Sequence, residues 1–227
     1  MNAEDDQGFV VRPLQDGDLA AAAQMQAREL ADGFLAQLGP GFLRAYLQTF
    51  LDTPGAVAFA ADSADGQFAG FLVGSTTVGH NRVALRRHWK RLLPAGAAAL
   101  LRRPRLLPPF LRTRAVRYVR AAVTALKPRP AATEVASEQA TEPTTAAGPS
   151  RPAVLLHVVV GPDERGQGVG AALVQAFVGA AREAGSSRAV LVSIGGEKDF
   201  YLRQGWQRLA ARQDDDGRVV VTYGRTL

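Results

Sequence analysis

The feature that most constrains the fold is an apolar, β-branched run that leads through a glycine-rich turn into an apolar helix. Residues 154–160 read Val-Leu-Leu-His-Val-Val-Val, which is typical of a strand buried at the centre of a sheet. A turn at 161–164 precedes Arg165-Gly-Gln-Gly-Val-Gly170. Apolar residues then recur at helical spacing up to Gly185, namely Val169, Leu173, Phe177 and Ala180. We therefore predict a strand, a turn and a helix in direct succession.

The glycine-rich turn predicts an anion site. Several backbone N–H groups meet at a helix N-terminus, where the side chains are small and the helix dipole favours negative charge. Arg165 adds a positive charge. A Walker-type loop has Lys-Ser/Thr after its last glycine, whereas Ala171-Ala172 follow here. The acidic ribose ligand expected about 20 residues on in a dinucleotide-binding loop is also missing. The alternative is that the glycines only permit a tight turn.

The cysteine and histidine counts exclude several kinds of site. The chain has 227 residues, no Cys and three His, so it has no disulfide, thiolate nucleophile or Cys-ligated metal. A multi-histidine metal site is not expected either, and we predict no metal. The first residues are acidic, unlike a secretory signal, and the longest apolar run has ten residues. A membrane span needs roughly 18, so we expect a soluble, cytoplasmic protein.

Positive charge is concentrated in one segment. No acidic residue occurs between Asp65 and Glu134, and residues 80–130 hold 14 of the 27 Lys and Arg residues. Since the whole chain carries +6, the remainder carries −8. We considered a solvated helical lid, a membrane-surface helix that contacts anionic lipid, and a site for an acidic acceptor or nucleic acid. No base-stacking pattern stands out, so nucleic acid is not the expected partner.

The chain around this segment divides into recognisable stretches. We expect basic amphipathic helices over 82–93 and about 110–126, followed by a disordered linker over 128–152, which is rich in Pro, Ala, Thr and Ser. Before the segment, a strand at 9–12, two helices and two hairpin strands are expected, the hairpin turning at Asp62–Gly66. After it come the central strand and helix, a strand at 188–194, a short helix at 198–204 and a final hairpin.

These residues resemble the GCN5-related N-acetyltransferase (GNAT) superfamily. The match consists of Val158-Val-Val160, Gly161-Pro162, the turn Arg165 to Gly170, and then Phe200-Tyr-Leu-Arg-Gln-Gly-Trp206, which is similar to the family's F-Y-x-x-x-G-F/W element. The resemblance implies an α+β fold with a mixed sheet of about six to seven strands and flanking helices. Residues 9–78 and 153–227 would form the two halves of this domain. The basic helical insertion and linker, 79–152, have no counterpart in the family pattern.

The resemblance also implies a co-substrate and site residues. Acetyl-CoA would be the acetyl donor, and its pantetheine arm would pair with the backbone of Val158, Val159 and Val160 in a splayed gap between two strands. Amides of the turn would hold the pyrophosphate, which places Arg165, Gly166, Gln167, Gly168, Val169 and Gly170 in the site. Tyr201 stands where the family has a tyrosine near the thioester sulfur. It would act as general acid for the departing thiolate, or else pack its ring in the core.

The general base is less defined by the sequence. His157 lies in the predicted central strand, and an imidazole has a suitable pKa, but it could equally be structural, with water relayed through strand carbonyls as the base. Glu197 is a further candidate for base or substrate contact. Many family members have an Asn seven residues before the tyrosine, whereas this chain has Ile194.

The sequence therefore predicts an N-acetyltransferase that moves an acetyl group from acetyl-CoA to a primary amine of a small molecule. An amino sugar is one acceptor that we considered, with peptide amines next. The alternative is an acyl-CoA-binding adaptor without significant turnover, held at a membrane surface by the basic insertion. We expect that insertion to shape acceptor choice. Peripheral membrane contact and an oligomeric state are left open by the sequence.

Overall fold

The computed structural model describes residues 8–77, 79–103, 152–194, 198–214 and 217–227. It divides into two compact units that are each built from separated stretches of chain. Unit 1 comprises Met1–Leu14, Pro54–Val78 and Ala136–Leu227, and unit 2 comprises Gln15–Thr53 and Gly79–Val135. The predicted helix over 110–126, nearly all of the predicted linker, and Glu197 lie outside the described residues. The predicted domain boundaries stay a prediction.

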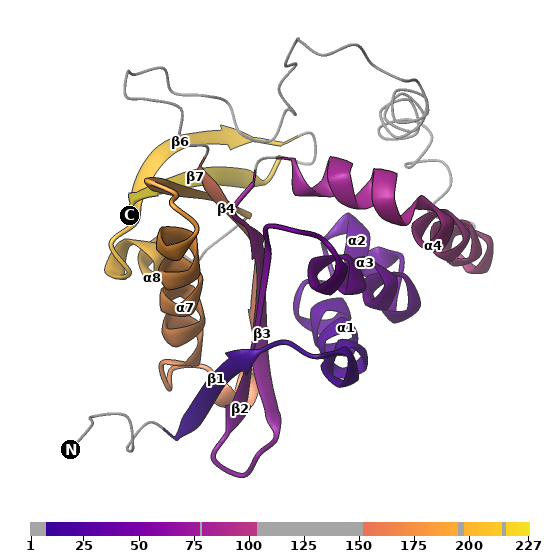
Figure 1. Ribbon diagram of the computed structural model, residues 1–227, viewed down its shortest axis with the longest axis horizontal. Helices are drawn as coiled ribbons and strands as arrows, with labels where there is room; N and C mark the ends of the chain where they lie inside the picture. The colour runs from indigo at the N-terminus through magenta and orange to yellow at the C-terminus, as the bar shows by residue number, and fades with distance from the viewer. Residues whose placement is uncertain (1–7, 78, 104–151, 195–197, 215–216) are drawn as a thin grey trace. The chain divides into compact units, whose positions relative to one another are not determined.

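Unit 1 contains a seven-stranded sheet in the order β1-β2-β3-β4-β5-β7-β6 (Figure 1). The parallel pair is β4 with β5, and the other neighbours are antiparallel. This mixed sheet confirms the predicted fold class. The strands are β1 (Phe9–Pro13), β2 (Ala56–Ser63), β3 (Phe68–Ser75), β4 (Ala153–Val160), β5 (Arg188–Ile194), β6 (Gln207–Gln213) and β7 (Val219–Thr226).

The first hairpin forms where the sequence predicts it. Gly66 has φ +72°, a value that glycine tolerates readily, and its N–H donates to the carbonyl of Ser63 at 2.9 Å. Beside this turn, Arg12 of β1 donates from Nε to Oδ2 of Asp62 at 2.6 Å. The ion pair is partly buried and joins β1 to the end of β2.

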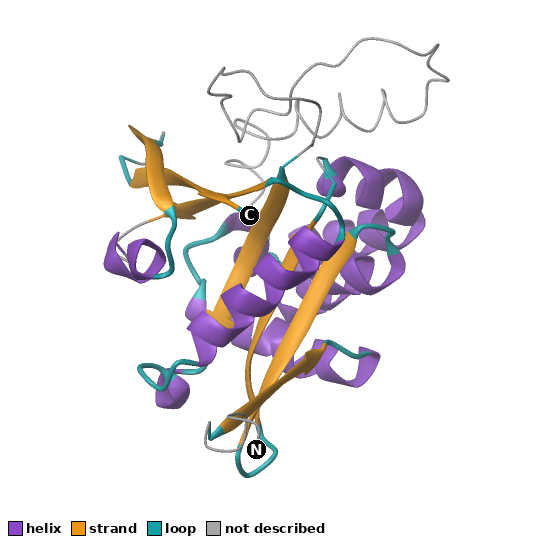
Figure 2. Cartoon of the chain, turned by 60° about the vertical axis from the view of Figure 1, so that its left-hand side comes forward, coloured by secondary structure: helices purple, strands orange, loops and turns teal. Residues whose placement is uncertain are grey.

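Helix α7 (Val169–Glu183) covers one face of the sheet. It packs against β1, β2, β3 and β4, and Figure 2 shows it lying across the strands. Leu173, Val174 and Phe177 are fully buried at its centre. A β-carbon at Gly74 of β3 would lie 2.6 Å from the Phe177 ring, so glycine is required for this close approach. A second, shorter α-helix among the described residues of unit 1 is α8 (Lys198–Arg203).

The described part of unit 2 is helical. Its helices there are α1 (Leu19–Glu29), α2 (Phe34–Gln37), α3 (Pro40–Asp52) and α4 (His80–Arg102), and α3 packs against both α1 and α4. Leu43, Tyr46, Leu47 and Phe50 are buried on α3 and form its apolar face. From α4, the buried His80 ring stacks on Phe50 with centroids 4.0 Å apart.

Helix α4 is longer than the predicted basic helix over 82–93. It continues through Pro94 and Gly96 to Arg102, with non-helical dihedral angles at His88. Pro94 cannot donate a backbone hydrogen bond, and proline commonly kinks a helix. Leu92 and Ala99, seven residues apart, are buried on the same side of α4. Their packing keeps the chain helical past residues that the sequence alone marks as helix breakers.

Candidate functional site

Strand β4 separates from β5 after Leu155. The two strands pair in parallel over only three positions, the last being Leu155 with Leu191. Both strands continue, β4 to Val160 and β5 to Ile194, but the described sheet has no further pairing between them. Residues Val158 to Val160 therefore have a sheet neighbour on one side only, which is β3. Their other edge presents backbone groups that an extended ligand could meet.

A β-bulge in β4 lies at the point of separation. Val73 of β3 pairs with His157, whereas the next residue, Gly74, pairs with Leu155. Leu156 is therefore the extra residue on β4. A bulge bends its strand and increases the local twist, so this one accounts for the departure of β4 from β5. Leu156 follows an identical residue, Leu155, and the sequence carries no signal for the bulge.

The glycine-rich turn connects the end of β4 to α7. Gly161 N–H donates to the carbonyl of Ala69 at 2.9 Å, which anchors the start of the turn to the neighbouring strand β3. Gly166 and Gly168 have φ of +82° and +92°, in the left-handed region that favours glycine. Gly168 is the N-cap residue, and α7 begins at Val169. The predicted strand, turn and helix are confirmed as a continuous unit.

The first turn of α7 presents backbone donors. The first N–H groups of an α-helix have no intrahelical acceptor, and the helix dipole makes this end partly positive. Gln167 does not project its amide as a further ligand, because its Nε2 donates to the carbonyl of Asp163 at 2.8 Å. Arg165 Nε donates to the carbonyl of Val160 at 3.3 Å. The arginine charge is thereby held beside the end of β4.

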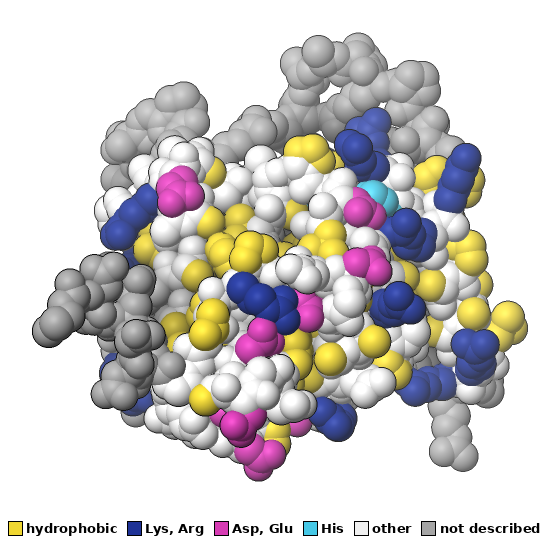
Figure 3. All heavy atoms as spheres, turned by 60° about the horizontal axis from the view of Figure 1, so that its bottom comes forward, with side chains coloured by type: hydrophobic (Ala, Val, Ile, Leu, Met, Phe, Trp, Pro, Cys, Tyr) yellow, Lys and Arg dark blue, Asp and Glu magenta, His cyan; other side chains and the backbone are white. Residues whose placement is uncertain are grey.

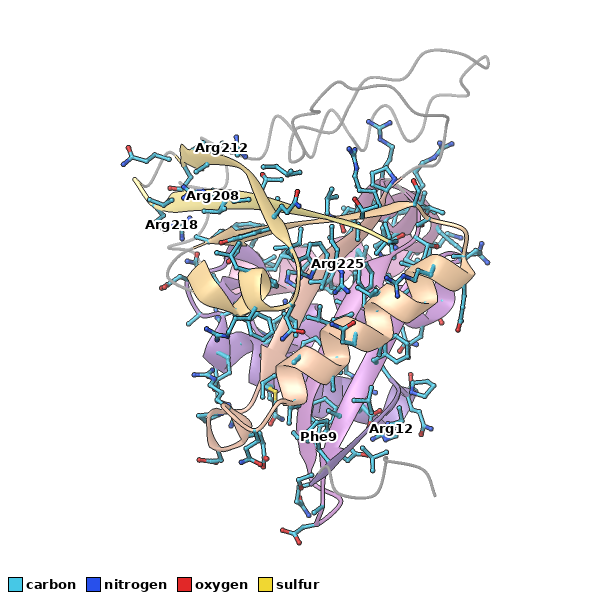
Figure 4. All side chains as sticks on the ribbon, turned by 90° about the vertical axis from the view of Figure 1, so that its left-hand side faces the viewer. Phe9, Arg12, Arg208, Arg212, Arg218 and Arg225 are labelled. Carbon is cyan, nitrogen blue, oxygen red and sulfur yellow. The ribbon has the colours of Figure 1, made fainter. Side chains whose placement is uncertain are left out.

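Two phenylalanines flank the glycines of the turn. A β-carbon at Gly170 would lie 3.3 Å from Cζ of Phe200, and one at Gly168 would lie 3.8 Å from Cε1 of Phe9. Figure 4 labels Phe9 on β1. Phe200 comes from α8, so the F-Y element of the sequence meets the glycine-rich turn in space. Phe9 was not predicted as a neighbour of the turn, because nothing in its local sequence links it to residues 160 positions away.

Tyr201 lies in an aromatic cluster of unit 1. Its ring centroid is 5.0 Å from that of Phe200, 5.3 Å from Tyr223 and 6.3 Å from Trp206. The residue is 5% exposed and belongs to the core beneath α7. Its ring therefore packs in the core, as one of the two interpretations of the sequence expects. Its role as an acid stays a prediction.

His157 lies on β4 at the bulge, paired with Val73. Burial lowers the pKa of His157 from 6.5 to about 4, so the imidazole is neutral at neutral pH. Ile194, the residue in place of the family's Asn, ends β5 and is exposed. In unit 1 the structure thus brings together the end of β4, the turn, the start of α7 and Phe200.

The described residues include no group of three or more His, Asp or Glu side chains that could hold a metal ion. Among the described helices, none combines the length and apolarity required to cross a membrane.

Comparisons with known proteins agree with this geometry. Residues 119–227 match a family model described as an acetyltransferase (GNAT) domain. Ard1 from Thermoplasma volcanium is 15% identical with a TM-score of 0.54, over 97% of this chain and 98% of that chain. A GCN5-related N-acetyltransferase from Kribbella flavida is 14% identical with a TM-score of 0.54, over 97% and 98%. At such identities the solved structures show a shared fold.

A third solved structure, nourseothricin acetyltransferase, is 18% identical with a TM-score of 0.41, and the match covers 76% of this chain and 66% of that chain. A search of curated proteins gave no match.

Proposed function

We propose that this chain, whose residues 119–227 match an acetyltransferase (GNAT) domain, transfers the acetyl group of acetyl-CoA to the primary amine of a small molecule. The observation that carries the proposal is the departure of β4 from β5 directly before a glycine-rich turn and a helix N-terminus. The open edge of β4 is followed within a few residues by the backbone N–H donors of the turn and of α7. Acetyl-CoA has matching groups, since its extended pantetheine arm carries amides and its other end carries a diphosphate.

The donor would bind along β4. In this proposal the pantetheine amides pair with the backbone of Val158, Val159 and Val160, on the edge that β5 leaves uncovered. The pyrophosphate accepts hydrogen bonds from the backbone of the turn, Gly166 to Gly170, where small residues let an anion approach. Arg165, held at the carbonyl of Val160, adds a compensating charge. These are this chain's own groups, and each serves to bind and orient the thioester.

Transfer would proceed directly from thioester to amine. The neutral amine nitrogen attacks the thioester carbonyl carbon, a C–N bond forms, and the C–S bond breaks. The departing thiolate takes a proton from the phenol of Tyr201, and solvent returns that proton. The amine loses one proton to water, so the products are an N-acetylated amine and free CoA. The chain has no Cys, and this route requires no covalent enzyme intermediate.

Proton removal from the amine is assigned to water relayed along the strand carbonyls. The alternative base is His157, whose pKa of about 4 lies far below the value of roughly 10 of an alkylammonium group. Water is an even weaker base, but a water relay passes the proton on to bulk solvent, whereas a protonated His157 would hold the charge in surroundings that disfavour it. His157 therefore serves better as a neutral residue that supports the bulge than as the base.

The acceptor is proposed to be a small primary amine, and amino sugars are the first class to test. The main alternative function is an acyl-CoA-binding adaptor without significant turnover. Calorimetry with CoA and detection of free thiol from acetyl-CoA with a panel of amines separate the two. We expect CoA binding and amine-dependent thiol release. Binding without release for every amine supports the adaptor, and failure to bind CoA contradicts both.

A further inference from the structure

Helix α4 exposes an apolar stripe after its kink. Trp89, Leu93, Ala97 and Leu101 follow one another at intervals of four residues, and all four are exposed. Trp89 is 46% exposed and Leu101 is 79% exposed. Single exposed apolar side chains are ordinary, but a row of them along one helix marks an interaction surface. The proposed acetyl transfer does not use this row.

Cations lie directly beside the stripe. Arg82, Arg86 and Lys90 also recur at intervals of four and are exposed, and Lys90 Nζ lies 5.9 Å from the centroid of the Trp89 ring. No acidic residue occurs anywhere in α4 or within fourteen residues before it. We call this surface the α4 face and define it as Arg82, Arg86, Trp89, Lys90, Leu93 and Leu101. Figure 3 shows one face of the molecule, on which Lys and Arg side chains are intermixed with acidic and apolar ones.

The opposite side of α4 packs against the rest of unit 2. His80, Ala84, Leu92 and Ala99 are buried. Arg91 Nη1 donates to Oδ2 of Asp52 at 2.9 Å, and His88 Nε2 lies 3.3 Å from Oγ1 of Thr53. Both contacts join α4 to the C-terminal end of α3. These contacts set the rotation of the helix. The α4 face points outward because its other side is already occupied.

We propose that the α4 face docks on the surface of an anionic lipid bilayer. A helix with Trp and Leu beside Arg and Lys lies in the membrane interface, with its apolar side chains among the acyl chains and its cations at the headgroups. Arg and Lys stems can lie along apolar surface while their charges reach phosphate. A second copy of the chain fits this face less well, because two such faces would bring like charges together. The inference goes beyond the proposed acetyl transfer and does not depend on it.

Vesicle flotation of the full chain without acetyl-CoA tests the proposal. We expect binding to vesicles of phosphatidylcholine with phosphatidylglycerol, little binding to phosphatidylcholine alone, and weaker binding at high salt. The double variant Arg82→Gln/Arg86→Gln is expected to lower the partition coefficient roughly 30-fold, since each cation near an anionic surface contributes roughly fivefold. Trp89→Ala/Leu93→Ala is expected to abolish most of the remaining binding, because it removes the inserted side chains.

A matched control removes the same charge elsewhere. Arg208→Gln/Arg212→Gln changes two exposed arginines of β6 in unit 1, labelled in Figure 4, and is expected to bind like the unchanged protein. Thermal melts of all variants verify that they fold. Equal loss of binding in this control, or equal binding to neutral and anionic vesicles, would overturn the proposal. So would binding to nucleic acid in place of vesicles, or Trp89-dependent self-association without lipid.

Tryptophan fluorescence gives a second readout. The chain has two tryptophans, Trp89 on the α4 face and Trp206, which is 2% exposed in the core of unit 1. Brominated acyl chains are expected to quench part of the emission of the unchanged protein on anionic vesicles, and Trp89→Phe is expected to remove that quenching. Quenching that persists in Trp89→Phe, or no quenching despite flotation, would contradict insertion of this face.

Discussion

Arg165 Nε donates a hydrogen bond of 3.3 Å to the carbonyl oxygen of Val160, five residues earlier in the chain. The residue that opens the glycine-rich turn is thereby tied to the last residue of β4. The proposed pantetheine edge and the proposed pyrophosphate site lie at the two ends of this contact. A change at Arg165 therefore tests whether the strand edge and the turn act as one binding surface.

Arg165→Ala is expected to weaken CoA binding about tenfold, because it removes a charge-assisted contact worth roughly 1.5 kcal/mol at an exposed position. Calorimetry at two salt concentrations measures this loss, which should be smaller at high salt. Arg165→Lys is expected to recover part of the affinity. Arg208→Ala, an exposed arginine of β6, is the control and should bind CoA unchanged. An equal loss in this control would mean that only net charge matters.

Gly168→Ala is expected to destabilise the protein by roughly 1–2 kcal/mol and to weaken CoA binding, because φ of +92° strains any residue with a β-carbon. Gly179→Ala is the matched control in the same helix. A β-carbon at Gly179 meets no atom within 4 Å, so alanine should stabilise α7 by roughly 0.5–1 kcal/mol. Urea unfolding and calorimetry with CoA measure both effects. Unchanged CoA affinity in Gly168→Ala would argue that the turn is only structural.

Tyr201→Phe is expected to lower kcat about 100-fold, since loss of a general acid removes that order of catalysis. The ring stays in place, so CoA affinity should not change. Tyr223→Phe is the control, because Tyr223 is equally buried and packs 5.3 Å from Tyr201. Steady-state thiol release gives kcat, and calorimetry gives the Kd for CoA. If both variants retain full kcat, the phenol of Tyr201 is not the acid.

Two histidines with lowered pKa values predict a dependence of stability on pH. Burial lowers the pKa of His157 to about 4, and burial with the nearby charge of His88 lowers the pKa of His80 to about 4. The unfolded chain takes up these protons below about pH 6.5. The free energy of unfolding should therefore be highest above pH 6.5 and fall as the pH decreases toward 4. Each histidine contributes on the order of 3 kcal/mol to this loss.

Urea unfolding at several pH values between 4 and 7 measures this dependence. His157→Asn removes one titrating group and should flatten the curve, whereas His88→Asn should leave most of it, since burial lowers the pKa of His88 but the carboxylate of Asp52 raises it. An unchanged slope in His157→Asn would contradict a neutral His157 with a lowered pKa. The same variant should keep kcat within about tenfold if water is the base, since loss of a general base costs 100-fold or more.

The sequence was sufficient to predict the strand, turn and helix of the candidate site. Val and Leu in the strand, glycines in the turn and helical spacing in α7 are local signals, and each acts within a few residues. The bulge at Leu156 is not local in this sense, because it depends on how Val73 and Gly74 pair with β4. The approach of Phe9 to Gly168 likewise depends on the completed sheet.

Helix α4 shows a second limit of local signals. Pro94 and Gly96 predict the end of a helix, yet burial of Leu92 and Ala99 sustains it to Arg102. The burial of His80 was also not predicted. Its neighbours in sequence are Gly79 and Asn81, whereas its environment comes from Phe50 and Thr49 on α3. In both cases a tertiary contact outweighs a local preference.

Each unit consists of stretches that are interrupted in the sequence by the other unit. Truncation at a single position can therefore never yield either unit intact. Excision of 79–152 would remove from α3 the helix that contacts Phe50 and Thr49. A chimaera that swaps unit 2 with that of a relative needs two coordinated exchanges, one for each stretch. Point substitutions, rather than truncations, are the appropriate instrument for separating donor binding from lipid docking.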